Sequence, residues 1–171
     1  MDTKKHARFS WAAELLDIKP NDTLLEIGCG VGLAIEEIAS KVNRGNILAI
    51  DRSEKMIQKA IQRNNHYLNS GKVEFLKTDM LHFKKDQLFN KIFCFNINLF
   101  WTQKSIAEEI TILKSHLTKK GLLHIFYGPM VASGLAKIKS PLTQNLKNEK
   151  INVIEIVFDK KLNCCCFVCC V

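Results

Sequence analysis

The sequence predicts an α/β fold in which a mostly parallel sheet is covered by helices on both faces. From residue 23 onward, short apolar runs alternate with segments of helical periodicity, the pattern of repeated strand and helix units. Glycines follow the first apolar run at alternate positions, Gly28, Gly30 and Gly32. The length of 171 residues, 47% of them hydrophobic, suits one domain over residues 1–171 with a sizeable core.

Apolar runs give the candidate strands. They cover residues 23–28, 46–51, 73–79, 91–100, 121–127, 151–158 and 164–171. Only residues 159–163 separate the last two runs, which is too short a spacer for a helix. We therefore expect these two strands to form an antiparallel hairpin at the sheet edge.

Apolar residues at helical spacing predict the helices between the strands. The expected buried stripes are Ile35, Ile38, Ala39 and Val42; Ile57, Ala60, Ile61 and Leu68; and Ile106, Ile110, Leu113 and Leu117. An N-terminal helical segment within residues 1–20, at about residues 7–17, should end before Pro20, and residues 21–171 form the core.

Two later helical segments are defined by their terminating residues. The helix that carries Leu117 is expected to end on Lys119, Lys120 and Gly121, since basic residues and glycine favour helix C-termini. Pro129, Gly134 and Pro141 interrupt residues 128–150, where one or two short helices are expected.

Composition favours an intracellular globular protein. Lys and Arg number 25 against 17 Asp and Glu, a net charge of +8, but the basic residues are scattered and favour solvated element ends over a nucleic-acid surface. The N-terminus shows no signal peptide, and no apolar stretch has membrane-spanning length. We expect a cytoplasmic protein that does not bind membranes.

Five of the seven cysteines lie in the final stretch CCCFVCCV. Cys166 and Cys169 are spaced as CxxC, but a second pair at metal-ligand spacing is absent from the sequence. Because free cysteine behaves as a small apolar residue, a buried strand is favoured over a metal or redox site.

The glycine-rich stretch LLEIGCGVG, Leu24 to Gly32, indicates a nucleotide site after the first strand. It lacks the Lys-Ser or Lys-Thr of a Walker loop, and Leu33 stands where a GxGxxG dinucleotide loop has its third glycine. Asp51 ends the second predicted strand, where a carboxylate can bind ribose hydroxyls. Glu26 suits a sulfonium or ammonium better than a pyrophosphate.

The stretch EIGCGVG, Glu26 to Gly32, together with Asp51 and Asp79 at successive predicted strand ends, resembles the class I S-adenosylmethionine-dependent methyltransferases. The resemblance covers nearly the whole chain. It implies a Rossmann-like three-layer sandwich whose seven-stranded, mostly parallel sheet has the order 3-2-1-4-5-7-6 with the last strand antiparallel. It also implies S-adenosyl-L-methionine as the cofactor.

The resemblance also implies which residues contact the cofactor. The methionine end is assigned to Glu26, Gly28, Gly30 and Asn96, the ribose to Asp51 and Arg52, and the adenine to Asp79 and Met80. The complete set of predicted cofactor contacts is Glu26, Gly28, Cys29, Gly30, Gly32, Asp51, Arg52, Met56, Asp79, Met80 and Asn96. A metal site is not expected.

The acceptor site is less defined. Asn98, Trp101 and Tyr127 are predicted to shape it, and Tyr127 is the candidate for a general base. His82 and His124 are isolated histidines, which are more often structural or solvated than catalytic.

Several acceptor classes lack their family signatures in this chain. The Asn96-Ile97-Asn98-Leu99 stretch has no prolines, unlike amino-methylating nucleic-acid enzymes, and the segment after it has no paired glutamates, unlike arginine methyltransferases. The predicted function is methyl transfer to a small-molecule acceptor by a monomer or homodimer. Alternatives are a tRNA or rRNA methyltransferase, suggested by the positive charge, a non-catalytic S-adenosylmethionine-binding protein and, last, a nicotinamide oxidoreductase.

Overall fold

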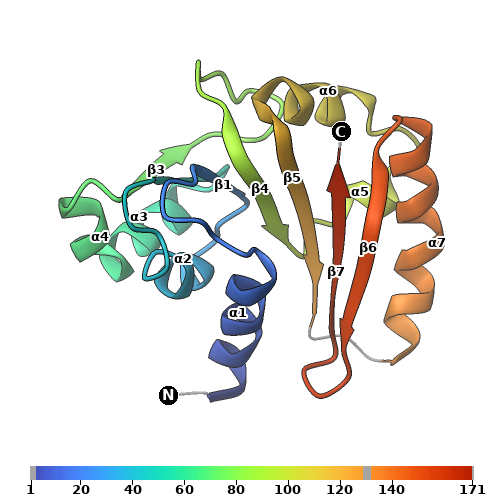
Figure 1. Cartoon of the computed structure of the whole chain (residues 1–171), viewed down its shortest axis with the longest axis horizontal. Coiled ribbons are helices and arrows are strands. Elements are labelled where there is room, and N and C mark those ends of the chain that lie inside the picture. The colour runs from blue at the N-terminus through green and yellow to red at the C-terminus, as the bar shows by residue number, and fades with distance from the viewer. Residues whose placement is uncertain (1–2, 129–131, 171) are drawn as a thin grey trace.

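A computed structural model describes residues 3–128 and 132–170 as a seven-stranded sheet flanked by helices (Figure 1). The strands are β1 (Leu24–Ile27), β2 (Ile47–Asp51), β3 (Val73–Lys77), β4 (Phe89–Phe95), β5 (Leu117–Tyr127), β6 (Asn152–Asp159) and β7 (Cys164–Cys170). The helices are α1 (Thr3–Leu15), α2 (Leu33–Ile38), α3 (Glu54–Arg63), α4 (Asn65–Asn69), α5 (Leu99–Thr102), α6 (Ala107–His116) and α7 (Ala132–Asn148).

The strand order is β3-β2-β1-β4-β5-β7-β6, which confirms the predicted topology. The strands from β1 to β5 pair in parallel. β7 runs antiparallel to both β5 and β6, so the predicted hairpin lies at the sheet edge. The carboxyl ends of the parallel strands therefore meet along one edge, the usual ligand-binding edge of such sheets.

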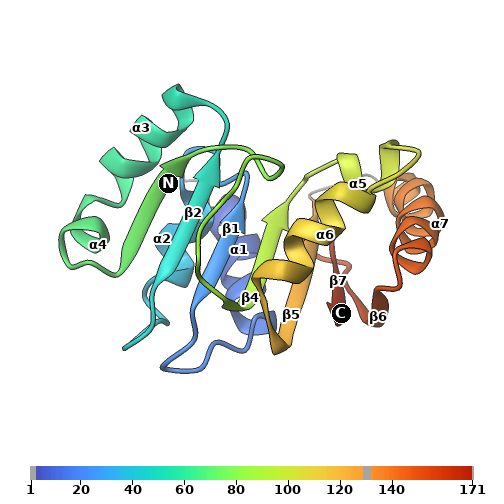
Figure 2. The same cartoon turned by 90° about the horizontal axis from the view of Figure 1, so that it is seen from above.

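Helices cover both faces of the sheet, as Figure 2 shows. One hydrophobic core joins α1, α2 and α3 to the sheet, and a second core joins α5, α6 and α7 to its other face. In β1, Leu24 belongs to the first core, whereas Leu25 and Ile27 belong to the second. Because strand side chains alternate, Glu26 points with Leu24 toward the side of α1, α2 and α3.

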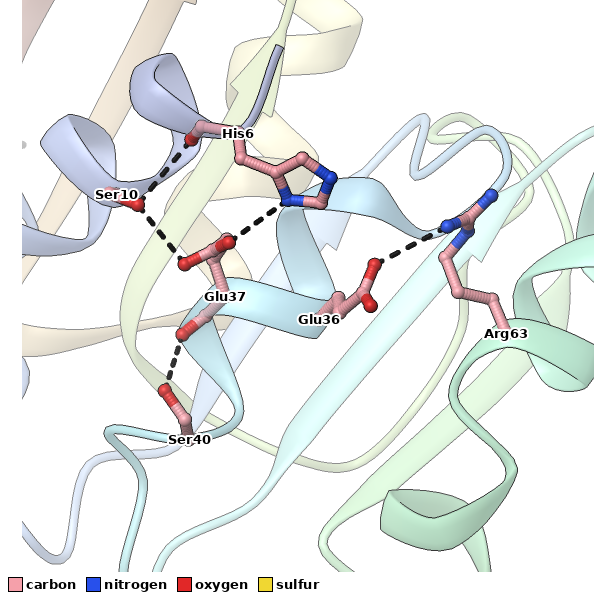
Figure 3. Close-up of polar contacts among 6 residues, drawn as sticks. All are labelled: His6, Ser10, Glu36, Glu37, Ser40 and Arg63. Carbon is pink, nitrogen blue, oxygen red and sulfur yellow. Dashed lines mark hydrogen bonds and ion pairs between the residues drawn. The ribbon is translucent and has the colours of Figure 1, made fainter. Parts of the chain in front are cut away.

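Polar contacts fix α1 against the rest of the domain (Figure 3). Glu37 of α2 accepts a hydrogen bond from Ser10 at 3.1 Å and lies 3.1 Å from Nδ1 of His6. Arg8 donates from Nη1 to the carbonyl oxygen of Gly128, just after β5, at 2.9 Å. The N-terminal helix is thus attached both to α2 and to the carboxyl edge of the sheet.

The predicted helical stripes are buried at most positions. All four residues of the first predicted stripe lie in the core, namely Ile35, Ile38, Ala39 and Val42. In the second stripe, Ile57 and Ala60 are buried, whereas Ile61 is half-buried. The N-terminal helix begins earlier than predicted, at Thr3, and ends at Leu15.

The prediction that the third striped helix runs to Gly121 is wrong. α6 ends at His116, and β5 begins at Leu117. The pairing of β5 with β4 is irregular between Leu117 and Leu122, and a Cβ on Gly121 would lie 3.0 Å from the carbonyl oxygen of Phe89. Gly121 therefore allows a bulged strand to pass close to β4 and does not end a helix.

Residues 128–150 also differ from the prediction of one or two short helices. α7 is continuous over Ala132–Asn148 and contains Pro141. A proline in a helix removes one backbone hydrogen bond, but Ile138, Leu142 and Leu146 bury an apolar stripe against the sheet. Tertiary packing thus outweighs the local preference, while Pro129 lies outside the described residues.

The cysteine-rich run forms a buried strand, as predicted. Cys164, Cys165, Cys166 and Cys169 of β7 are buried, and Cys170 is half-buried. Among residues 3–128 and 132–170, His, Cys, Asp and Glu form no group of three or more arranged to hold a metal. Within the same ranges, no helix is long and apolar enough to cross a membrane.

The buried strand predicts protected thiols. Burial raises the pKa of Cys165 to about 11 and of Cys169 to about 12, so neither forms the reactive thiolate at neutral pH. In a thiol titration with Ellman's reagent, Cys170 should react at least about tenfold faster than these two. Cys170→Ser should remove that fast phase; fast reaction of Cys165 or Cys169 in the folded protein would contradict the strand's burial.

Candidate nucleotide-binding site

The three glycines after β1 share a left-handed backbone but differ in what surrounds them. All have positive φ angles: 71° at Gly28, 54° at Gly30 and 73° at Gly32. A Cβ on Gly28 would lie 2.6 Å from Cδ1 of Ile97, and one on Gly32 would lie 2.5 Å from Nδ2 of Asn64. Nothing lies within 4 Å of the Cβ position of Gly30. Gly30 therefore presents the open face of the loop.

Asp51 connects the end of β2 to this loop. Its Oδ2 accepts a hydrogen bond from the backbone N–H of Gly30 at 2.9 Å, and its Oδ1 accepts one from the N–H of Ser53 at 2.8 Å. Each carboxylate oxygen retains a free lone pair for a further donor. The side chain is thus held in one orientation at the carboxyl edge of the sheet.

Glu26 lies behind the loop and is 2% exposed. Burial, together with the nearby charge of Asp51, raises the pKa of Glu26 to about 8. Its Oε2 has no hydrogen-bond partner among the described residues. A buried carboxyl oxygen without a hydrogen-bond partner is costly, and a donor or cationic group bound beside it would be stabilised.

Asp79 follows β3 and bonds locally to His82. Its Oδ1 accepts hydrogen bonds from the backbone N–H of His82 at 2.9 Å and lies 2.8 Å from that residue's Nδ1. Hydrogen bonding to His82 lowers the pKa of Asp79, so it is ionised at neutral pH. The Asp79 carboxylate can therefore accept a further hydrogen bond at the end of β3.

A cavity of about 400 Å³ opens between the ends of β1, β2, β3 and β4. That volume suits one ligand of cofactor size. The lining residues are Ile27, Gly28, Ile50, Asp51, Arg52, Thr78, Asp79, Met80, Asn96, Ile97, Asn98 and Leu99. The lining combines apolar side chains with the carboxylates of Asp51 and Asp79 and the amides of Asn96 and Asn98.

Asn96 shapes the wall between β4 and β5. Its φ of 55° lies in the left-handed region. Its side chain makes two hydrogen bonds with the backbone of Gly128: Nδ2 donates to the carbonyl oxygen at 3.0 Å, and Oδ1 accepts from the N–H at 2.9 Å. Tyr127 is buried and donates its hydroxyl to the carbonyl of Ile97 at 2.7 Å. Burial raises the pKa of Tyr127, so the phenol stays protonated and supports the wall.

The structure brings together part of the predicted set. Among the predicted cofactor contacts, the cavity is lined by Gly28, Asp51, Arg52, Asp79, Met80 and Asn96. Glu26, Cys29, Gly30, Gly32 and Met56 are not among the lining residues. Of the predicted acceptor residues, Asn98 lines the cavity, while Trp101 and Tyr127 do not. The roles of all these residues as ligand contacts stay predictions.

Sequence reasoning missed five lining residues, namely Ile27, Ile50, Thr78, Ile97 and Leu99. Ile27, Ile50 and Thr78 each directly precede a predicted site residue at a strand end. Their place in the sequence could therefore have indicated that they line the cavity. Ile97 and Leu99 carry no such signal, because apolar residues after a strand serve a core equally well.

The two candidate histidines lie elsewhere. His82 is exposed and bonded to Asp79. His124 is buried on β5, and burial together with Lys91 lowers its pKa to about 4. Neither lines the cavity.

Comparison with known proteins agrees with this geometry. A sequence model of a family described as a methyltransferase domain matches residues 18–169. Ribosomal protein L11 methyltransferase of Caldicellulosiruptor saccharolyticus is 31% identical over 151 residues, covering 88% of this chain and 44% of that protein. The chain spans less than half the length of the two curated relatives that it matches at 31% and 32% identity.

Solved structures share the fold. An S-adenosylmethionine-dependent methyltransferase from Aquifex aeolicus is 20% identical, with a TM-score of 0.72 over 92% of this chain and 87% of that one. Magnesium protoporphyrin IX methyltransferase of Synechocystis PCC 6803, solved with bound S-adenosylmethionine, is 15% identical, with a TM-score of 0.72 over 98% of this chain and 79% of that one.

The family match spans nearly the whole chain, and the strand order and the acidic strand ends around the cavity are those that the sequence resemblance implies. The chain belongs to the class I methyltransferase domain family, whose cofactor is S-adenosylmethionine.

Proposed function

We propose that this chain binds S-adenosylmethionine in the cavity at the ends of β1 to β4 and transfers its methyl group to a small-molecule acceptor. The observation that carries the proposal is the Asp51 carboxylate, fixed by the N–H groups of Gly30 and Ser53 beside a cavity of about 400 Å³. A carboxylate held in this way is ready to accept from the two hydroxyls of a ribose.

The residues present fit this cofactor. The orphaned Oε2 of Glu26 favours a cationic group near the glycine loop, which a dianionic pyrophosphate would not provide. The open face of Gly30 leaves room for a ligand against the backbone. Asp79, an ionised residue of the cavity lining, offers an acceptor for the amino group of an adenine.

In the proposed reaction the cofactor supplies a methyl group that is already activated on a sulfonium. Asp51 with Arg52 would hold the ribose, Asp79 with Met80 the adenine, and Glu26 with the glycine loop the methionine end. Ile27, Ile50 and Leu99 line the cavity and would exclude water from its apolar wall once the cofactor is bound. The protein would align the acceptor with the methyl group and exclude water from the site. A general base is required only if the acceptor must lose a proton.

The acceptor is proposed to approach over Asn98, between the ends of β4 and β5. The phenol of Tyr127 is engaged by the carbonyl of Ile97, which favours acceptors that need no strong base from the protein. The porphyrin methyltransferase structure, whose named acceptor is a small molecule, supports the proposal through its similar fold over 98% of this chain.

Calorimetry separates the proposed cofactor from its rivals. The purified chain should bind S-adenosylhomocysteine and not NADH. Binding of NADH alone would overturn the proposal, and turnover on RNA with salt-sensitive binding would favour the nucleic-acid alternative.

Asp51 offers a sharper residue-level test. Asp51→Ala should weaken binding of S-adenosylhomocysteine by about 1.5 to 3 kcal/mol, the scale of hydrogen bonds to a charged group. Asp51→Asn should be nearly as damaging, because its amide nitrogen would face the N–H of Gly30 or of Ser53. The exposed Asp86→Asn is the control. Unchanged affinity in Asp51→Ala, measured by calorimetry, would remove this residue from the site.

Two glycines with similar backbone give a matched pair. Gly30 and Gly71 have φ angles of 54° and 71°, and both have open space at the Cβ position. Alanine at either position should therefore cost about 1 kcal/mol of stability through left-handed strain. Only Gly30→Ala should also weaken S-adenosylhomocysteine binding, by at least about tenfold. Equal affinities in the two variants would place the cofactor away from Gly30.

Glu26 predicts a pH dependence of stability. Its pKa rises from the ordinary value of 4.5 to about 8 on folding, so the folded chain holds one more proton than the unfolded chain between these values. The free energy of unfolding should therefore fall as pH rises through that range, by on the order of 5 kcal/mol. Urea denaturation of cofactor-free protein should show this fall, and Glu26→Gln should abolish it. The same pH profile in both proteins would refute the shift.

A further inference from the structure

The end of α3 holds the far side of the glycine loop. Nε of Arg63 donates to the carbonyl oxygen of Val31 at 3.1 Å, and Nδ2 of Asn64 donates to that of Gly32 at 3.0 Å. Two consecutive residues of one helix terminus thus bind two consecutive carbonyls of the loop. Arg63 also pairs with Glu36 of α2 at 3.3 Å, as Figure 3 shows.

Asn64 is placed for donation. It is 0% exposed, and Nδ2 reaches both Gly32 and the carbonyl of Ala60, each at 3.0 Å. Its Oδ1 is buried with no hydrogen-bond partner among the described residues. An orphaned buried amide oxygen is a cost that a smaller apolar residue would avoid. Asparagine at this position does, however, supply the hydrogen bond from Nδ2 to the carbonyl oxygen of Gly32.

These bonds orient the turn around Gly30. In a trans peptide the C=O and N–H groups point in opposite directions, so holding the Val31 carbonyl toward α3 directs the N–H of Gly32 back into the loop. That N–H donates to the carbonyl of Cys29 at 3.0 Å, which closes the turn. Gly30, with its open face and its N–H bound to Asp51, lies inside this turn.

We propose that Arg63 and Asn64 are positioning residues for cofactor binding, which hold the carbonyls of Val31 and Gly32 so that the Gly30 face stays open to the nucleotide cofactor. The inference rests on the proposed function. Neither residue lines the cavity, so each acts through the loop.

Calorimetry with S-adenosylhomocysteine on the full chain tests this, at a temperature where circular dichroism shows each variant folded. Arg63→Met removes the donor from an exposed position, and Arg63→Gln retains an N–H donor without the charge. Glu36→Gln removes the ion pair but keeps Arg63 beside Val31. Asn64→Ala removes the second donor, and the exposed Asn65→Ala is its neighbouring control.

The expected result is a loss of affinity of about three- to tenfold in Arg63→Met and Asn64→Ala, with Arg63→Gln recovering most of it. Glu36→Gln and Asn65→Ala, the two controls, should stay within about twofold of wild type. A purely structural role would lower the melting temperature and leave the affinity of the folded protein unchanged. Equal affinity in Arg63→Met, Arg63→Gln and wild type overturns the inference, even if Asn64→Ala does not fold. Absence of binding by wild type overturns the proposed function as well.

Discussion

The hydrogen bonds of the Asp51 carboxylate are the interaction on which the site depends. One side chain joins the end of β2, the glycine loop through Gly30 and the start of α3 through Ser53. Gly30 and Asp51 are 21 residues apart in the chain, so no local propensity would place the glycine loop beside the end of β2. Because both oxygens are already anchored by backbone donors, the carboxylate is preorganised for a ligand and loses little freedom when one binds.

The sequence predicted the fold well, because the signals for it are local and repeated. The alternation of apolar runs with helical stripes predicted the sheet and its helices, and the short spacer at 159–163 predicted the hairpin. Two predictions failed where packing overrides propensity. Gly121 serves a bulge in β5, and Pro141 is carried inside α7 by the apolar stripe around it. Such outcomes depend on neighbours from distant segments, which a single sequence does not reveal.

Only part of the site could be predicted, because the rest depends on contacts between segments that are distant in the sequence. Acidic residues at strand ends are visible in a sequence, and Asp51 and Asp79 do meet at one cavity. The three glycines are indistinguishable in the sequence, but their surroundings differ in the structure. Gly32 packs against the end of α3 and Gly28 against Ile97, and of the three only Gly30 has open space at its Cβ position. The supporting role of Arg63 and Asn64 at the end of α3 could not be predicted from the sequence. An Arg-Asn pair at a helix end is normally explained by solvation and capping alone.

The antiparallel course of β7 separates the described ends of the chain. β7 runs away from the carboxyl end of β5, and its last residue, Cys170, pairs with Leu122 in the middle of β5, whereas α1 contacts Gly128, just after β5, through Arg8. A surface tether or fused partner attached behind β7 would therefore leave the mouth of the cavity accessible. The same attachment ahead of α1 would crowd the wall that Asn96 and Gly128 build. For immobilisation or biosensor design, the two ends of this fold are not interchangeable.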